Sequence, residues 1–290
     1  MVGIILAGGK GTRLWPSTKV VSKQLLPVFD KPLIYYPLAT LMLAGIREII
    51  IVVNPRDLDL YEALLGTGKK LGIDFRYVVQ TEPRGIADAF NVCKQYISGR
   101  STCLILGDNI FHGNGMGNFL SRYTNPKGAQ IFAYKVSNPG EYGVVEFDAR
   151  NNVMSIEEKP LSPRSNYGIP GLYFYDSQVC EITESLKPSP RGELEISDVN
   201  RTYLLRKELE VEILPRGTAW LDTGSRETLH DAGTYIRIME ERQSYKIACI
   251  EEIAWRKGWI DSRQVSITAM EYGQNSYGNY LREIVTVGYK

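Results

Sequence analysis

A glycine-rich turn directly after a short apolar run constrains this chain more than any other feature of its sequence. Gly3–Ala7 is short enough for a buried strand, and Gly8-Gly9-Lys10-Gly11-Thr12-Arg13-Leu14 follows it at once. Its glycines permit a tight turn, and the backbone N–H groups of such a turn can hold phosphate oxygens. Arg13, and Lys23 ten residues later, add positive charge. The segment therefore predicts a nucleoside triphosphate loop.

The motif differs from two familiar phosphate-binding patterns. A Walker loop requires Gly-Lys-Ser/Thr where this chain has Gly11-Thr12-Arg13, and the dinucleotide fingerprint requires a glycine where this chain has Leu14. A glycine cluster alone is equally compatible with an ordinary strand-to-helix turn. The other motifs of the chain have to decide between these interpretations.

Composition excludes several classes of protein. With 43% apolar and 23% charged residues, a chain of 290 residues is typical of one large α/β domain or a domain with an appendage. A net charge of +1 argues against a broad nucleic-acid surface, and the apolar runs are too short to span a membrane. Because a strand begins almost at the first residue, we expect no signal peptide.

The four scattered cysteines indicate a reduced, cytoplasmic protein with buried thiols. We expect the two histidines, His112 and His230, to be structural or surface residues.

Strands and helices alternate over residues 1–110, which predicts an α/β fold with a mainly parallel sheet and helices on both faces. The expected strands are Gly3–Ala7, Glu48–Val53, Phe75–Val79 and Thr102–Leu106, and the expected helices lie near Leu33–Leu43, Leu58–Leu65 and Ala87–Ile97. Ligands of such sheets bind beyond the carboxyl ends of the strands. Gly8–Arg13 and Gly107-Asp108-Asn109 should therefore share one rim.

Asp108 is the first candidate ligand for Mg²⁺, because a carboxylate beside a phosphate loop can hold the ion against phosphate oxygens. A plain Asp-Asn turn is an equally good interpretation of this residue alone. Asp222, expected in a turn beside Trp220, is the second candidate ligand. Ser22–Pro27 is expected to be extended, and Lys23, although most lysines are simply solvated, is expected to contact phosphate.

Two further loops are candidates for substrate contacts. The amide of Gln80 offers the donor and acceptor that a uracil or thymine edge requires, and Gly85 permits close approach of a base, although a plain strand-to-helix loop explains both residues. Glu158 can bind sugar hydroxyls and Lys159 a sugar phosphate. An exposed acid–base pair on a hairpin is the simpler interpretation of these two residues.

The second half of the chain changes character. Short strands are expected at Ala129–Val136, Gly143–Phe147, Val153–Ile156, Gly171–Tyr175 and Leu209–Ile213. Residues 176–206 are expected to be helical with a break at Pro188–Gly192. A helix over Glu227–Arg242 should pack its apolar stripe on the main domain or on another subunit. Residues 243–290 are expected to form a helical appendage, whose tyrosines are compatible with an interface; they are Tyr272, Tyr277, Tyr280 and Tyr289.

Taken together, these motifs resemble the sugar-phosphate nucleotidyltransferases along nearly the whole chain. The shared segments are Leu6–Leu14, Ser22–Pro27, Gly107–Asn109, Tyr142–Val145, Glu157–Pro160 and Trp220–Gly224. Lys31–Leu38 and Arg191–Ile196 are similar to the bacterial glucose-1-phosphate thymidylyltransferases within that family. The set as a whole is far more specific than the glycine motif alone.

The resemblance implies a fold and a reaction. The fold is a Rossmann-like mixed sheet with a small β subdomain and C-terminal helices. It implies a nucleotidyltransferase domain over residues 1–225, with a nucleotide half at about 1–110 and a sugar half at about 111–225, and an interface segment at 226–290. The reaction joins dTTP and α-D-glucose 1-phosphate into dTDP-glucose and pyrophosphate, a first step toward dTDP-rhamnose and related deoxysugars. A homotetramer and feedback by a dTDP-sugar at a second site are implied as well.

The resemblance also assigns roles to residues. The catalytic set is Arg13, Lys23, Asp108, Lys159 and Asp222, of which Asp108 and Asp222 hold Mg²⁺. Nucleotide contacts are expected from Leu6, Gly8, Gly9, Gly11, Thr12, Arg13, Lys23, Gln24, Gln80, Pro83, Gly85 and Asp108. Contacts to the sugar phosphate are expected from Asn109, Gly143, Glu158, Lys159, Ile169 and Tyr173.

Departures from the subgroup leave alternatives open. Arg84-Gly85-Ile86-Ala87-Asp88 replaces the usual Asp-Gly-Leu-Ala-Gln after the base loop, and Asn166–Pro170 differs from the usual sequence beside the sugar. A preference for UTP or for another hexose 1-phosphate is the alternative within the enzyme class. A catalytically silent nucleotide-sugar sensor is the alternative outside that class, although a sensor has no need for the full set of charged residues.

Overall fold

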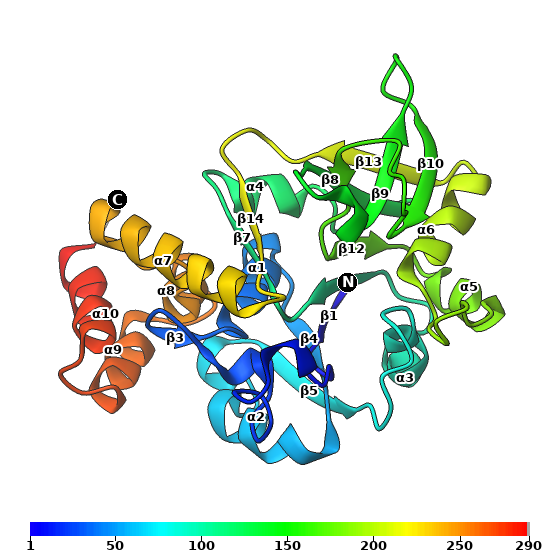
Figure 1. Ribbon diagram of the computed structural model, residues 1–290. Helices are drawn as coiled ribbons and strands as arrows, with labels where there is room; N and C mark the ends of the chain where they lie inside the picture. Colours follow the sequence, from blue (N-terminus) through cyan, green and yellow to red (C-terminus); the bar gives the residue numbers. More distant parts are fainter. Residues whose placement is uncertain (289–290) are drawn as a thin grey trace.

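The computed structural model describes residues 1–288, and Tyr289 lies outside the described residues. A ten-stranded mixed sheet forms the centre of the molecule, in the order β10-β9-β11-β8-β12-β6-β1-β4-β5, with β13 paired to β8 (Figure 1). The strands are β1 (Val2–Leu6), β4 (Glu48–Val53), β5 (Asp74–Val79), β6 (Thr102–Leu106), β8 (Ala129–Lys135), β9 (Gly143–Phe147), β10 (Val153–Glu158), β11 (Tyr167–Gly168), β12 (Leu172–Tyr175) and β13 (Leu209–Ile213).

The pairing of neighbouring strands changes from parallel to antiparallel between β6 and β12. Strands β6, β1, β4 and β5 are parallel, as the alternation of strands and helices predicts. From β12 outward the pairs are antiparallel, except for the parallel pair of β13 with β8. The predicted mixed α/β sheet is therefore confirmed, and strands β8 to β11 extend the same sheet past its parallel part.

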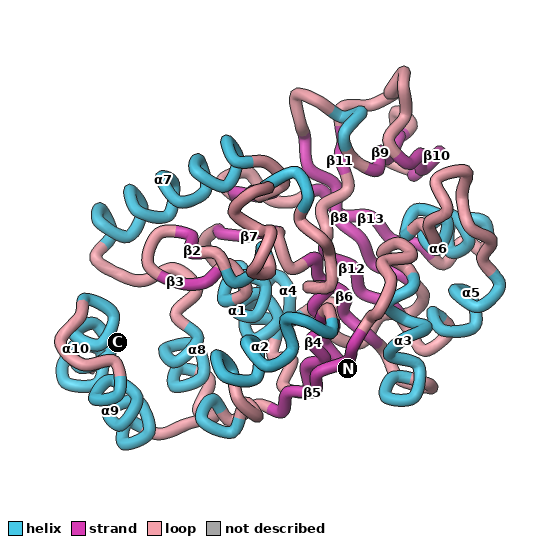
Figure 2. The backbone as a smooth tube through the Cα atoms, turned by 60° about the horizontal axis from the view of Figure 1, so that its bottom comes forward, coloured by secondary structure: helices cyan, strands magenta, loops and turns pink. Residues whose placement is uncertain are grey.

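Helices cover both faces of the sheet, as Figure 2 shows. They are α1 (Tyr35–Ala44), α2 (Leu58–Leu65), α3 (Asp88–Ile97), α4 (Met116–Ser121), α5 (Val179–Ser185), α6 (Ile196–Leu205), α7 (Arg226–Gln243), α8 (Ile250–Arg256), α9 (Ser262–Glu271) and α10 (Ser276–Val287). Because side chains alternate along a strand, Ile5 and Ile51 join the core with α1, while Ile4 and Ile50 join the core with α3. The buried, unpaired cysteines fit this packing; they are Cys93, Cys103, Cys180 and Cys249.

The C-terminal helices are fixed to the sheet domain by an apolar and an ionic contact. Ala232 and Ile236 of α7 pack on Val28 of the short hairpin β2 (Pro27–Val28) and β3 (Lys31–Pro32), which confirms packing of the stripe on the main domain. Beside them, Glu240 accepts hydrogen bonds from Lys31 Nζ at 2.9 Å and Lys246 Nζ at 3.1 Å. Both lysines also bind Asp30. Paired charges at such buried positions fix the register of α7 against the hairpin.

Two local expectations were wrong. Asp222 does not lie in a turn, since it ends strand β14 (Ala219–Asp222), which pairs antiparallel with β7 (Asn109–His112). Ser22–Pro27 is not extended throughout, because Lys23–Leu25 forms one turn of 3₁₀ helix. Both histidines are where they were expected: His112 is hydrogen-bonded to Tyr235 and Tyr245, and His230 is exposed. Over residues 1–288, no helix has the length and hydropathy needed to cross a membrane.

A buried carboxylate in the C-terminal helices gives a pH-dependent prediction. Glu251 is 3% exposed and accepts hydrogen bonds from Tyr272 at 2.9 Å and Tyr277 at 2.7 Å. Burial raises the pKa of Glu251 above its usual value although these hydroxyls oppose the shift. The protonated form of Glu251 is therefore favoured in the folded state. The stability of the wild-type protein falls as the pH rises from the pKa of Glu251 in the unfolded chain to its higher pKa in the folded protein.

We expect Glu251→Gln to be more stable relative to wild type at pH 8 than at pH 5. The urea midpoint of the variant minus that of wild type should therefore be larger at pH 8. The difference in unfolding free energy should grow by about 1.4 kcal/mol for each unit by which the pKa is raised. Urea titrations at both pH values check this, with the exposed Glu241→Gln as the control for loss of a charge. An identical difference at pH 5 and pH 8 would contradict the prediction.

Candidate active site

The ribbon of β7 and β14 brings the two candidate carboxylates to one place. Asp108 comes two residues after the end of β6, and Asn109 begins β7. Asn109 is paired in register with Asp222, and the main-chain oxygen of Asp108 accepts hydrogen bonds from Thr223 N at 3.1 Å and Thr223 Oγ1 at 2.9 Å. Residues more than a hundred positions apart in the sequence are thereby held next to each other.

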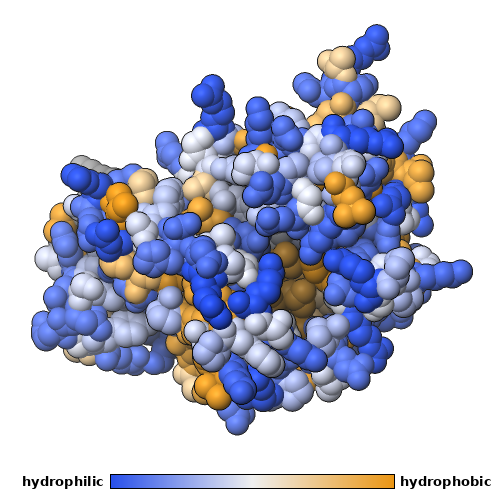
Figure 3. Space-filling model, viewed as in Figure 1, coloured by the Kyte–Doolittle hydropathy of each residue, from blue (hydrophilic) through white to orange (hydrophobic). Residues whose placement is uncertain are grey.

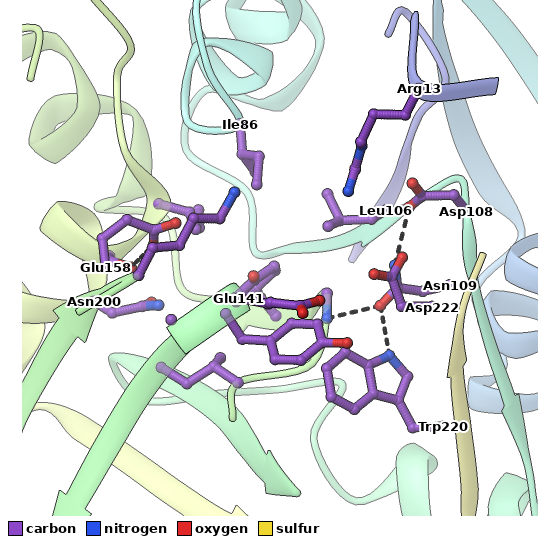
Figure 4. A pocket seen from close by; sticks show the side chains of 18 residues that line it. Arg13, Ile86, Leu106, Asp108, Asn109, Glu141, Glu158, Asn200, Trp220 and Asp222 are labelled. Carbon is purple, nitrogen blue, oxygen red and sulfur yellow. Dashed lines mark hydrogen bonds between the residues drawn. The ribbon is translucent and has the colours of Figure 1, made fainter. Parts of the chain in front are cut away.

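The side chain of Asn109 fixes this arrangement. Its Oδ1 accepts hydrogen bonds from Trp220 Nε1 at 2.7 Å and from Gly171 N at 3.0 Å, and its Nδ2 donates to Asp108 Oδ1 at 3.0 Å (Figure 4). Both polar atoms of the amide are hydrogen-bonded, and Asn109 is only 2% exposed. Its side chain therefore holds the Asp108 carboxylate in one orientation. The resemblance to the family implies that Asn109 also contacts the sugar phosphate.

Positive and negative groups meet at this carboxylate pair. Lys23 Nζ lies 2.8 Å from Asp108 Oδ2, and Lys23 is only 6% exposed. Burial alone would raise the pKa of Asp108, but the ammonium of Lys23 and the hydrogen bonds lower it below the usual value. Burial, and then the charge of Asp108, raise the pKa of Asp222 to about 6. Both carboxylates line one cavity, which is described below.

The glycine-rich turn borders a cavity of about 320 Å³. Gly11 has a φ of 61°, which favours glycine, and its carbonyl oxygen accepts a hydrogen bond from Thr18 Oγ1 at 2.6 Å. Predicted residues on this cavity are Gly9, Gly11, Thr12, Arg13, Lys23, Gln24, Pro83 and Asp108. Lys10, Leu14 and Gly224 line it too; they were not predicted as site residues, although all three lie inside the two glycine motifs.

A second cavity of about 450 Å³ adjoins the first, sharing Arg13 and Asp108 with it. Figure 3 shows a hollow near the centre of one face of the molecule, with an apolar floor and a hydrophilic rim. In Figure 4, Asp108, Asn109 and Asp222 lie at one end of the second cavity, and Glu158 and Asn200 lie at the other. Predicted residues on it are Arg13, Asp108, Asn109, Gly143, Glu158, Lys159, Ile169, Tyr173 and Asp222.

The end of the cavity near Glu158 is shaped by a glycine and held by polar contacts. A Cβ on Gly143 would lie 3.4 Å from Glu158 Oε2 and 3.2 Å from Ser197 Oγ, so a side chain there would crowd both groups. Ser197 donates a hydrogen bond to Glu158. Arg191 Nη2 lies 3.7 Å from Glu158 Oε1 and 2.9 Å from Glu195 Oε2. Arg191 and Ser197 were not predicted as site residues, although they lie in and directly after the Arg191–Ile196 motif.

Four predicted nucleotide residues, among residues 1–288, do not line either of the two cavities: Leu6, Gly8, Gln80 and Gly85. Gln80 Oε1 comes within 3.2 Å of where a Cβ on Gly8 would be. A Cβ on Gly85 would lie 2.4 Å from the carbonyl oxygen of Leu194, so packing of two loops also requires a glycine there. Arg84 is turned to the surface, with its Nη2 3.3 Å from Glu82 Oε2.

The donor set fits a hard divalent cation that also binds phosphate. Within residues 1–288, no cluster of three or more His, Cys, Asp or Glu side chains is arranged to hold a metal, and the carboxylates on the second cavity are Asp108, Glu141, Glu158 and Asp222. Mg²⁺ in phosphate-transferring sites takes one or two carboxylates and completes its shell with water and phosphate oxygens. Asp108 and Asp222, which share a cavity with Arg13 of the glycine-rich turn, can supply these carboxylates.

Comparisons with known proteins identify the family of this chain. Residues 2–237 match the family model described as nucleotidyl transferase. The chain is 53% identical over 285 residues to a glucose-1-phosphate thymidylyltransferase of Mycobacterium tuberculosis, covering 98% of this chain and 99% of that protein. It is 50% identical to the protein of the same name from Xanthomonas campestris pv. campestris, with 99% and 97% covered.

Among solved structures, a Bacillus anthracis protein described as a "putative glucose-1-phosphate thymidylyltransferase", in complex with sucrose, superposes with a TM-score of 0.75. It is 37% identical to this chain, and the match covers 82% of this chain and 96% of that one. The structural similarity therefore spans most of this chain.

Proposed function

The chain belongs to the nucleotidyl transferase family, and we propose that it transfers a thymidylyl group from dTTP to α-D-glucose 1-phosphate, giving dTDP-glucose and pyrophosphate. One observation carries the proposal: the cavity at the glycine-rich turn and Lys23 and the cavity ending at Glu158 meet at Asp108, and Asp222 lines the second of them. The relatives with this name match the chain over nearly its full length.

The proposed chemistry needs alignment and neutralisation of charge more than a strong base. A phosphate oxygen of glucose 1-phosphate forms a bond to the α-phosphorus of dTTP, and the bond from that phosphorus to the bridging oxygen of pyrophosphate breaks. The attacking oxygen is already anionic, so no general base has to remove a proton. Arg13, Lys23 and Lys159 offset the repulsion between the two anions and the charge that gathers at phosphorus.

Within this proposal, different residues bind different parts of the two substrates. The N–H groups of the turn at Gly9 and Gly11, with Arg13, bind the triphosphate, and Gln80 and Gly85 face the base. Glu158 binds sugar hydroxyls, Lys159 binds the sugar phosphate, and Asn109 holds Asp108 in place. Asp108 and Asp222 would hold Mg²⁺, which neutralises phosphate oxygens and orients them when it is bound.

A matrix of nucleotides against sugar phosphates tests the function. Pyrophosphate release is measured with dTTP, UTP, ATP and GTP, each combined with glucose 1-phosphate, galactose 1-phosphate and mannose 1-phosphate. We expect the highest kcat/KM for dTTP with glucose 1-phosphate. A higher value for UTP or another hexose would replace the substrate assignment, and binding without pyrophosphate release in any combination would favour a sensor.

The assembly and its control are part of the proposal. We propose that residues 226–290 form an interface in a homotetramer, which the exposed Ile238, Ile267 and Met270 support. Light scattering gives the oligomeric state.

We also propose that a dTDP-sugar regulates the enzyme at a cavity of about 600 Å³ between α1, β7 and the C-terminal helices. Inhibition by dTDP-rhamnose that excess dTTP does not reverse would support the second site, and purely competitive inhibition would contradict it.

A further inference from the structure

A buried carboxylate behind the proposed base site fixes the direction of an amide. Gln80 follows β5, and its main-chain N–H donates to Val53 O at 2.9 Å, so its backbone is held to the sheet. Its side-chain Nε2 donates to Asp88 Oδ2 at 2.9 Å. Gln80 is 4% exposed and Asp88, in the first turn of α3, is 7% exposed. Neither group is free to turn toward bulk water.

This contact allows one orientation of the Gln80 amide. A carboxylate accepts hydrogen bonds and an amide NH₂ donates them, whereas an amide oxygen only accepts. Turning the amide over would bring its oxygen against Asp88 Oδ2, and two buried acceptors in contact are strongly unfavourable. Asp88 therefore directs Nε2 toward α3 and Oε1 toward Gly8.

The oxygen of the amide stays available to a ligand. Within residues 1–288, no donor hydrogen-bonds to Gln80 Oε1, yet this atom is not among the fully buried atoms that lack a partner. It lies 3.2 Å from the position of a Cβ on Gly8, at the start of the phosphate-binding turn. Any base that reaches Gln80 from this turn therefore meets an acceptor.

We propose that Asp88 is a positioning residue for base selection: it holds Gln80 with its oxygen toward the base and so favours thymine and uracil over cytosine. The inference rests on the proposed function. Thymine and uracil carry an N3–H that donates to the Gln80 oxygen, while cytosine has an acceptor at N3. Asp88 prevents the Gln80 amide from turning over, so its NH₂ group cannot donate to cytosine N3. With cytosine bound, N3 and the Gln80 oxygen are therefore two acceptors facing each other.

The test compares kcat/KM for dTTP and dCTP in the full-length wild type, Asp88→Asn and Asp88→Ala. Asparagine has almost the same shape as aspartate but can donate as well as accept, so it permits both orientations of the Gln80 amide. We expect the preference for dTTP over dCTP to fall by about tenfold or more in both variants, mainly through a lower KM for dCTP. Asn91→Ala is the matched control, because Asn91 Nδ2 lies 3.4 Å from the other oxygen of Asp88, and within residues 1–288 no hydrogen bond joins Asn91 to Gln80. Its preference should equal that of wild type.

Several outcomes separate this inference from the function on which it rests. If both Asp88 variants turn over dTTP with the wild-type preference, the inference is overturned. If the wild type turns over no nucleotide, the proposed function fails, and calorimetric affinities for dTDP and dCDP in the same proteins then decide the inference by the same ratio. Should both variants fail to fold, wild type is assayed with N3-methyl-dTTP, which lacks the N3–H. A large loss of kcat/KM supports the inference, and turnover comparable to that of dTTP overturns it.

Discussion

Asp108→Asn is expected to reduce turnover by about a thousandfold, or about 4 kcal/mol in transition-state stabilisation. The substitution leaves the shape of the side chain unchanged, so the hydrogen bond from Asn109 and the ribbon of β7 and β14 have no steric reason to move. The negative charge is lost, however, and with it the ionic partner of Lys23, whose Nζ lies 2.8 Å from Asp108 Oδ2. One of the two carboxylates proposed to hold Mg²⁺ is lost at the same time.

Initial rates and nucleotide affinities with and without Mg²⁺ check this prediction. We expect the variant to bind dTTP only weakly when Mg²⁺ is present, because the neutral amide is a poorer ligand for a hard cation. Asp59→Asn, an exposed position in α2, is the control and should keep wild-type rates. Turnover of Asp108→Asn within a few-fold of wild type would remove this carboxylate from the mechanism.

Arg13→Ala is expected to cost about 3 kcal/mol or more in kcat/KM, mostly as a lower kcat. Arg13 lines both cavities, and Figure 4 shows its side chain directed into the space beside Asp108. Gly224 leaves room for this side chain, since a Cβ there would lie 3.2 Å from Arg13 Nη1. A guanidinium at this position is suited to charge that develops on phosphate oxygens during transfer.

Steady-state kinetics separate the two roles that Arg13 can have. A fall in kcat shows that the guanidinium acts in the transition state, whereas an increase in KM alone would make it a ground-state contact to dTTP. Arg84→Ala is a matched control, because Arg84 is exposed, paired with Glu82 and absent from both cavities within the described part of the chain. If both arginine variants lost activity equally, a general effect of positive charge would explain the result.

Local sequence was sufficient for much of the fold and part of the site. Glu48–Val53, Leu58–Leu65 and Thr102–Leu106 have the predicted bounds because each has strong apolar periodicity and clear ends. The glycine-rich turn lies at a strand end for the same reason. Asp88 also stood out in the sequence, as a carboxylate where an amide is usual, but its partner was not visible there.

What the sequence determined by itself was which residues carry the chemistry: the glycine turn, Lys23 and the two carboxylates could all be selected from short motifs. The tertiary structure decided how they meet. Asp222 reaches Asp108 only because β14 pairs with β7, and Gln80 is oriented only because α3 returns Asp88 to the end of β5. Hydrogen bonds between distant segments depend on the packing of the whole chain, and a local pattern contains no record of which segments will become neighbours.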